Sequence, residues 1–465
     1  MIRLFTMNKI KKTKILAKIA DNRSDVNFVK GLFEAGADVA WLNTAHQDEA
    51  ATIDVINKIR SITTEIPIMI DTKGPEIRTK NITTPIEVKA GDSLIFTGDL
   101  SYTGQNVVQV SYPNFHEEVS VGKSVLYDDA SIEIVIEEKL EKGVRGVVKS
   151  AGLIKNKKSL NIPGVHIQLP ALSDKDIGFI HFCAKNNVDF IIHSFVRNKE
   201  DIFEIKNITN EYPDYKPKII AKIENREGFD NVEEILENCE GLMVARGDLG
   251  AEVPLEELPY MQKKMVESAL KHGKYCIVAT QVLESMIKNP RPTRAEVTDI
   301  ANAVLDGTDA MSMSGETAYG DYPYEATRLM GRVMAYTESK RDSLVHFTAS
   351  PKGNSKILEE AKLIIEEANK ANAKAIFINT NEISIAKSVS SLRPLCPLYI
   401  SCLKPEDQRE LRLAYAAFGV KVDELNIKSL AKFAEESLSE DSTVLIVEDS
   451  QGGYTTTTKN FADLI

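Results

Sequence analysis

The chain has 465 residues, more than one hydrophobic core normally organises, so its length predicts several domains. Hydrophobic residues at 43% and charged residues at 27% are typical of a soluble globular protein, and the net charge of -11 argues against a general nucleic-acid binder. The five cysteines form no CxxC pair, and no apolar run is long enough to span a bilayer. We therefore expect a cytoplasmic protein that binds neither nucleic acid nor membrane.

Short β-rich runs alternate with amphipathic helical patterns through most of the chain. Eight of these runs have the length of strands, and they begin at Thr13, Asp38, Pro67, Asp189, Lys218, Gly241, Tyr275 and Asp309. The helical patterns between them include residues 25–37, 48–62, 174–187 and 254–273. Eight strand-helix units predict a (β/α)8 barrel with its chemistry at the carboxyl ends of the strands. An open, doubly wound sheet is the alternative.

The third unit is interrupted by an insertion. Between residues 75 and 168, alternating apolar runs with glycine turns replace the helical pattern and predict a small all-β insert, most simply a barrel. Such an insert can close over the site as a lid that excludes water, although a purely structural insert has the same pattern.

A further unit begins at about residue 345. Strand patterns at residues 374–380, 397–402, 420–425 and 442–449 alternate with helical patterns and predict a three-layer α/β domain. The predicted domains are therefore the barrel (1–74 and 169–344), the β insert (75–168) and the α/β domain (345–465).

Charged residues collect where two consecutive predicted strands end. Lys222 and Glu224 are two positions apart in KIIAKIEN and share one face of an extended segment, and Asp248 follows the next run. Two carboxylates at the same edge suit a hard divalent cation, and a neighbouring lysine suits phosphoryl charge. For one strand alone, a salt bridge at the strand end is the simpler interpretation. Other predicted strand ends carry Asn43, Asp71, Thr280 and Ser314.

Several longer motifs resemble the pyruvate kinase family. They are the run PRPTRAEVTDIANAVLDGTDAMSMSGETAYGDYP from Pro290, with MVARGDLGAEVP, ATQVLESM, KIEN, DTKGPEIRT and NIPGVHIQLPALSDKD, in the family's order. The resemblance implies a (β/α)8 A domain, an inserted β-barrel B domain that closes as a lid, and an α/β C domain, usually assembled as a homotetramer. It also implies transfer of the phosphoryl group of phosphoenolpyruvate to ADP in the last step of glycolysis, giving pyruvate and ATP, with Mg2+ (or Mn2+) and K+.

The resemblance implies roles for individual residues. Glu224 and Asp248 match the Mg2+ ligands, and Lys222 matches the cation that stabilises the transferring phosphoryl group. The backbone amides of Gly247 and Asp248 match the site for the substrate carboxylate. The hydroxyls that match proton delivery to the enolate, through water, are those of Thr280 and Ser314, and Thr280 also lies beside the substrate carboxylate in the match.

The same resemblance implies a potassium site and a nucleotide site. The potassium ligands are matched by Asn43, Asp71 and the carbonyl oxygen of Thr72, and Glu76 is the residue type that accompanies potassium dependence. The contacts to the nucleotide and its phosphates are matched by Asn43, His46, Arg78 and Lys158, and Arg78 also matches a contact to the substrate.

The chain departs from the family pattern in the first two predicted strands. Trp41 stands where the family has an arginine that contacts the transferred phosphoryl group, and Ala45 replaces a serine that ligates potassium. Loss of a charge-assisted contact to phosphate predicts a large kinetic penalty. Ile19-Ala20 replaces a Gly-Pro turn near the adenine site, and Arg23 is a candidate source of the missing charge.

Two further departures lie elsewhere. His193 stands where the family usually has a small residue, and we expect it to pack in the core. Residues 380–385 lack the glycine and arginine of the family's sugar-phosphate loop and include Glu382, whose carboxylate would repel a phosphate. Activation by fructose 1,6-bisphosphate is therefore not expected.

An active pyruvate kinase is the function that these residues favour. One alternative is a catalytically weak homologue that binds phosphoenolpyruvate or nucleotide in a regulatory role, motivated by Trp41. Another is a different barrel enzyme that uses Mg2+ and an enolate.

Overall fold

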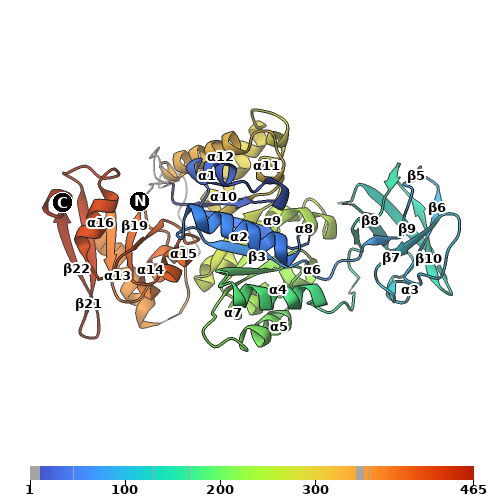
Figure 1. Ribbon diagram of the computed structural model, residues 1–465, viewed down its shortest axis with the longest axis horizontal. Coiled ribbons are helices and arrows are strands. Elements are labelled where there is room, and N and C mark those ends of the chain that lie inside the picture. Colours follow the sequence, from blue (N-terminus) through green and yellow to red (C-terminus); the bar gives the residue numbers. More distant parts are fainter. Residues whose placement is uncertain (1–10, 46, 129, 166, 342–349, 354) are drawn as a thin grey trace.

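The computed structural model describes residues 11–45, 47–128, 130–165, 167–341, 350–353 and 355–465. Three sheet-based units follow one another along the long axis of the molecule, with a barrel in the middle, a β-rich insert at one end and the C-terminal sheet at the other (Figure 1). Within these residues, no helix is both long and apolar enough to cross a membrane.

A closed barrel of eight parallel strands forms the centre of the molecule, which confirms the predicted fold. Each of the eight predicted runs forms one strand, and spatial order around the barrel follows chain order. The strands are β1 (Lys14–Lys18), β2 (Val39–Asn43), β3 (Ile68–Asp71), β13 (Phe190–His193), β14 (Lys218–Ile223), β15 (Gly241–Ala245), β16 (Tyr275–Ala279) and β17 (Ala310–Met313).

Helices cover the outside of the barrel. They are α1 (Val26–Glu34), α2 (Glu49–Ile62), α4 (Asp174–Lys185), α5 (Lys199–Thr209), α6 (Arg226–Asp230), α7 (Val232–Glu237), α8 (Arg246–Glu252), α9 (Leu258–His272), α10 (Arg294–Asp306), α11 (Gly315–Ala318) and α12 (Pro323–Glu338). Side chains of Asp25, Asp48, Ser173 and Thr293 cap α1, α2, α4 and α10. These caps satisfy backbone amides that the first turn leaves without partners.

The two faces of each barrel strand pack in different places. Ile15, Ala17 and Ile19 belong to the cluster under the outer helices, whereas Leu16 belongs to the cluster that fills the barrel interior. Because side chains alternate along a strand, Lys18 shares the interior face with Leu16. The same rule places Trp41 of β2 inside, and Trp41 is indeed a member of the interior cluster.

The insert leaves the barrel after β3 and returns before α4. Its seven-stranded sheet has the order β12-β8-β9-β10-β6-β7-β4, and β5 and β11 form a separate pair. The elements are β4 (Thr79–Lys80), β5 (Ile86–Val88), β6 (Ser93–Thr97), β7 (Val107–Val110), α3 (Phe115–Glu118), β8 (Ser124–Tyr127), β9 (Ile132–Leu140), β10 (Gly143–Val148), β11 (Gly152–Ile154) and β12 (Leu160–Asn161). A bridge between Arg78 and Ser159 joins the two edges of the large sheet, so the predicted small β-barrel is present.

The C-terminal unit is a five-stranded sheet of order β20-β19-β18-β21-β22. Its elements are α13 (Lys356–Lys370), β18 (Ala375–Asn379), α14 (Ser384–Ser391), β19 (Leu398–Cys402), α15 (Pro405–Leu411), β20 (Ala417–Lys421), α16 (Ile427–Ala434), β21 (Thr443–Ser450) and β22 (Gly453–Asn460). Helices α13 and α14 pack on one face of the sheet and α16 on the other. The three-layer prediction is therefore confirmed.

Two details of this sheet differ from the prediction. The strand expected at 420–425 lies earlier, at β20, where an added side chain at Gly419 would come within 3.0 Å of the backbone of Gln408 in α15. This glycine weakened the strand pattern, but it allows the helix to approach closely. Strand β22 was not predicted, because it lies at the sheet edge and its threonines are mostly exposed rather than alternately buried.

Candidate active site

Lys222 is the centre of a buried charged cluster at the carboxyl end of the barrel. Its Nζ lies 2.8 Å from Glu224 Oε1 and 3.5 Å from Asp71 Oδ2. Burial by itself would lower the pKa of Lys222, but the carboxylates of Asp71, Glu224 and Asp248 outweigh it and raise the pKa. Lys222 is therefore held as a fixed cation.

Glu224 and Asp248 fit a divalent cation. Glu224 is fully buried, and its Oε2 accepts the backbone N–H of Phe195 at 2.8 Å. Its Oε1 faces Lys222 without the geometry of a normal hydrogen bond, so acceptor capacity remains there. Burial raises the pKa of Glu224, and the nearby Asp248 carboxylate raises it further while Lys222 opposes both. A cation bound between the two carboxylates would favour their charged forms and oppose this rise.

No group of three or more His, Cys, Asp or Glu side chains suited to a metal occurs in the described ranges. A two-carboxylate site nevertheless matches the way Mg2+ is commonly held, because its remaining ligands are water and substrate oxygens.

The three residues matched to potassium ligands lie together, and Ser194 connects them. The Ser194 hydroxyl lies 2.8 Å from both Asp71 Oδ1 and the Thr72 carbonyl oxygen, and Asn43 Nδ2 donates to Asp71 Oδ2 at 3.4 Å. Carbonyl and carboxylate oxygens gathered in this way are suitable ligands for a monovalent cation. Ser194 was not predicted from the sequence. It could have been identified because it directly follows β13 and is two positions from Ile192, so its side chain faces the barrel interior.

Gly247 and Thr280 contact each other directly. The Gly247 N–H donates to Thr280 Oγ1 at 2.8 Å, so the predicted carboxylate cradle and the predicted hydroxyl are adjacent. Arg246 positions Thr280 from the other side. Its Nη2 donates to the Thr280 carbonyl at 2.6 Å, and its Nη1 forms an ion pair with Asp299 at 2.7 Å. Arg246 is a second residue that the sequence analysis did not assign to the site.

Ser314 lies at the start of α11, where its N–H donates to Glu316 Oε2 at 2.8 Å. The other oxygen of this buried glutamate accepts the N–H of Leu283 at 2.9 Å. Glu316 therefore fixes the loops that follow β16 and β17 relative to each other.

The residues matched to nucleotide contacts on the insert bind within the insert in this conformation. Arg78 Nε donates to Glu76 Oε2 at 2.7 Å and its Nη1 to the Lys157 carbonyl at 2.6 Å. Lys158 Nζ donates to Asp128 Oδ1 at 2.9 Å. His46, the remaining match, lies outside the described residues.

Arg23 does not supply the charge missing at position 41. Its Nη1 donates to the Gly320 carbonyl at 2.6 Å, and its guanidinium lies 4.5 Å from the ring centroid of Phe28. The cation over the Trp41 ring is instead Lys18. His193 is fully buried, as expected, and burial lowers its pKa to about 4, so the ring is neutral.

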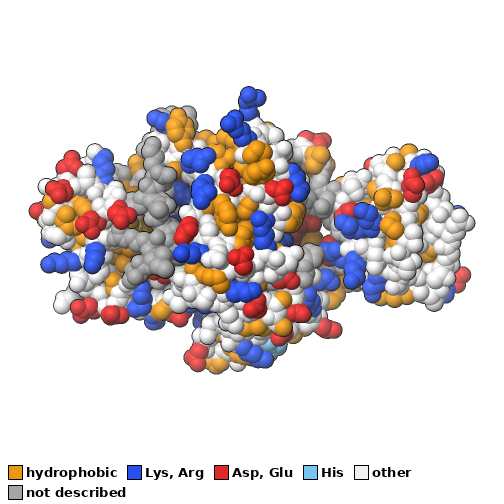
Figure 2. All heavy atoms as spheres, turned by 45° about the horizontal axis from the view of Figure 1, so that its top comes forward, with side chains coloured by type: hydrophobic (Ala, Val, Ile, Leu, Met, Phe, Trp, Pro, Cys, Tyr) orange, Lys and Arg blue, Asp and Glu red, His pale blue; other side chains and the backbone are white. Residues whose placement is uncertain are grey.

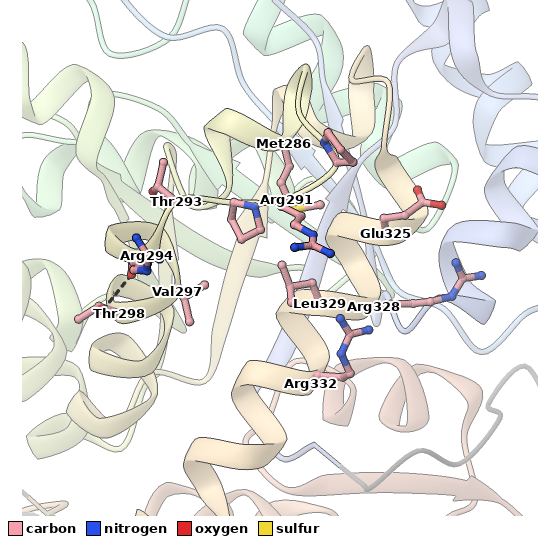
Figure 3. Close-up of a pocket in the computed structure, with 12 residues that line it drawn as sticks. Met286, Arg291, Thr293, Arg294, Val297, Thr298, Glu325, Arg328, Leu329 and Arg332 are labelled. Atoms are coloured by element: carbon pink, nitrogen blue, oxygen red, sulfur yellow. Dashed lines mark hydrogen bonds between the residues drawn. The ribbon is translucent and has the colours of Figure 1, made fainter.

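Two of the cavities in the described part of the chain border the barrel. One of about 500 Å³ lies between the insert and the barrel, and its lining includes Glu76, Phe195 and Glu252; the surface is hollowed between these units in Figure 2. The other, of about 690 Å³, lies on the outer surface between α10 and α12 and is lined by Arg291, Arg294, Arg328 and Arg332 (Figure 3). The second cavity is formed by outer helices and does not include the Lys222 cluster.

The fold and the charged cluster together define a (β/α)8-barrel enzyme with buried charged side chains at the carboxyl end of its strands. A family model described as "Pyruvate kinase, barrel domain" matches residues 10–327. A pyruvate kinase from Borreliella burgdorferi is 43% identical over 433 residues, covering 92% of this chain and 90% of that protein.

Two further relatives agree. A pyruvate kinase from Bacillus licheniformis is 36% identical over 464 residues, covering 97% of this chain and 79% of that protein. The crystal structure of a pyruvate kinase from Cryptosporidium parvum superposes with a TM-score of 0.89 at 34% identity, covering 97% of this chain and 96% of that one. The chain belongs to the pyruvate kinase family.

Proposed function

We propose that this chain transfers the phosphoryl group of phosphoenolpyruvate to ADP. The bond between phosphorus and the enol oxygen breaks, a bond to the terminal phosphate oxygen of ADP forms, and the enolate takes a proton at carbon to become pyruvate. The observation that carries the proposal is Lys222, a buried ammonium between Asp71 and Glu224 at the strand ends. A fixed cation stabilises phosphoryl charge without transferring a proton.

Each remaining site residue has a proposed role. Glu224 and Asp248 would hold Mg2+ or Mn2+, which when bound neutralises phosphoryl charge and orients substrate oxygens. Asn43, Asp71 and the Thr72 carbonyl would hold K+. The Gly247 and Asp248 amides would bind the substrate carboxylate, for which the Gly247 N–H must leave Thr280 Oγ1. Thr280 and Ser314 would guide, through water, the proton that reaches the enolate.

The insert would complete the site by moving. Arg78 and Lys158 of the insert, together with Asn43 and His46, are proposed to contact the nucleotide and its phosphates, and Arg78 also the substrate. Arg78 would then exchange its bond to the Lys157 carbonyl for a phosphate. Closure of the insert over the barrel would exclude water from the transferring group.

Two wider properties complete the proposal. A homotetramer in the cytoplasm is expected, and sedimentation velocity would measure the assembly. Activation by fructose 1,6-bisphosphate is not expected. The Asn381 N–H, which could otherwise donate to a bound phosphate, already donates to Asp449 Oδ2 of β21 at 2.8 Å.

The test is a coupled assay for pyruvate formation with Mg2+, run with and without K+. Wild-type turnover should fall by at least about 10³-fold in Lys222→Met, since one preorganised donor at developing charge is commonly worth about 10²–10³ and Lys222 also positions both carboxylates. Folding of the variant is checked by its melting temperature. Equal turnover in wild type and variant would refute the assigned role.

Nothing in the comparisons favours a catalytically weak homologue. The relatives at 36% and 43% identity are both named pyruvate kinases.

A further inference from the structure

Lys18 is a half-buried lysine on the interior face of the barrel strand β1. It is the last residue of β1 and pairs in register with Trp41 on the neighbouring strand. Its Nζ lies 5.2 Å from the centroid of the Trp41 ring. In the described part of the chain, this ammonium has no hydrogen bond and no ion pair, in contrast to Lys222.

The charges around Lys18 explain why it lacks a partner. Burial lowers the pKa of Lys18, and of its charged neighbours Asp71 opposes this effect while Lys222 adds to it. One Asp71 oxygen, however, already accepts a hydrogen bond from the Ser194 hydroxyl, and the other faces the Lys222 ammonium. Two ammonium groups therefore face one shared carboxylate, and Lys18 keeps only the face of an indole ring.

Such an arrangement favours binding of an anion. A partly buried cation without a counter-ion is costly, and a ring face compensates only part of that cost. A phosphoryl group placed between Lys18 and Lys222 would satisfy both ammonium groups. A purely structural lysine that lies along an aromatic ring would instead extend its ammonium to solvent.

We propose that Lys18 is a catalytic residue that binds the transferring phosphoryl group together with Lys222. This inference rests on the proposed function. Lys18 Nζ donates hydrogen bonds to non-bridging phosphoryl oxygens while phosphorus moves from the enol oxygen to the terminal oxygen of ADP, and it neither gains nor loses a proton. In this arrangement Lys18 of β1 supplies the positive charge that the neighbouring Trp41 cannot supply.

The chain contains its own reporter for this contact. Trp41 is its single tryptophan, so intrinsic tryptophan fluorescence reports on the surroundings of this one ring, which include Lys18. Titration of the wild-type protein with phosphoenolpyruvate, with and without Mg2+, should change this fluorescence. In Lys18→Met the apparent dissociation constant should rise at least about tenfold, and kcat/KM should fall about 10²-fold or more.

The matched control is Lys30→Met, which removes an ammonium on α1 that lies 3.7 Å from Glu34 on the outer surface. It should leave both measurements unchanged. A second variant, Lys18→Met with Trp41→Arg, returns a cation to the neighbouring strand and should recover at least about tenfold of the lost kcat/KM.

The proposal is overturned if Lys18→Met binds phosphoenolpyruvate and turns over within about threefold of wild type. It is also overturned if turnover falls while the fluorescence titration is unchanged, because Lys18 would then not contact the phosphate. A wild-type protein that forms no pyruvate would refute the proposed function instead, and the titration would still decide whether Lys18 binds the phosphate.

Discussion

Thr280 combines a site role with an unfavourable backbone conformation. Its φ of +67° lies in the left-handed region, which a β-branched residue rarely adopts and which costs on the order of 1–3 kcal/mol. The hydroxyl in turn accepts the Gly247 N–H at 2.8 Å. A strained residue that holds a neighbouring site amide indicates that the conformation is retained for the site rather than for stability.

Variants at Thr280 should separate stability from activity. Thr280→Gly relieves the strain but loses the hydrogen bond, whereas Thr280→Ala keeps a Cβ at positive φ and loses the same bond. We expect the glycine variant to melt at the same or a higher temperature than the alanine variant, although both lose at least about tenfold in kcat. Thr280→Ser should retain most activity. A glycine variant that melts well below the alanine variant would contradict this account.

At this scale the sequence was most informative where chemistry follows a strand end. Lys222 and Glu224 were predicted to share one face, and they do lie together, because alternation along strands fixes which side chains face inward; Asp71 joins them from β3. Lys18 and Ser194 obey the same alternation but were not selected. The contact that distinguishes each comes from a neighbouring strand, Trp41 for Lys18 and Asp71 for Ser194, and a single segment does not show that neighbour.

Among the elements, the connections that follow β15 and β16 act together. Arg246, the first residue of α8, donates to the Thr280 carbonyl after β16 and pairs with Asp299 on α10. Three elements from different parts of the chain are thereby joined through one guanidinium, whose planar group can serve several acceptors at once.

Arg246→Lys should therefore affect more than one element. Arg246 reaches its two acceptors with separate nitrogens, whereas a lysine is shorter and ends in one nitrogen. We therefore expect stability to fall by about 1–3 kcal/mol, seen as a lower melting temperature, together with a lower kcat. A double-mutant cycle with Asp299→Asn should give a coupling energy above about 0.5 kcal/mol. Arg226→Lys is the control, because its partners Asp230 and Glu257 are exposed; an equal loss there would contradict the prediction.

The elements themselves were largely predictable. All eight barrel strands have periodic apolar runs, and their burial follows from that pattern. Strand β22 was not predicted because an edge strand pairs on only one side and needs no buried face. Its pairing with β21, which begins at Thr443↔Asn460, depends on the tertiary structure and not on a local sequence pattern.

On the scale of the whole molecule, the barrel and the C-terminal sheet share one apolar cluster. Interior barrel residues such as Leu16 and Ile220 belong to the same cluster as Ile376 and Leu398 of the sheet. Lys14 lies within this junction, and its Nζ donates to the Ala417 carbonyl at 2.7 Å. Burial lowers the pKa of Lys14 to about 7, with Asp38 and Glu338 opposing the effect and Lys11 and Arg412 adding to it.

The low pKa of Lys14 predicts a dependence of stability on pH. Between about pH 7 and pH 10 the unfolded chain holds a proton that the folded protein has released, so stability rises with pH, by up to about 1.4 kcal/mol per unit. Lys14→Met lacks this contribution. The melting temperature of wild type relative to the variant should therefore increase from about pH 7 to about pH 9. Parallel profiles would show that Lys14 stays protonated in the folded state.

The insert enters and leaves the barrel through neighbouring points. The Lys73 N–H, just after β3, donates to Asp176 Oδ1 in α4 at 2.7 Å, so residues far apart in sequence stand side by side at the base of the insert. The insert also has an apolar core of its own, drawn from residues 77 to 169. Because its two ends are adjacent and its core is its own, the insert is a segment whose length could change without altering the path of the barrel strands.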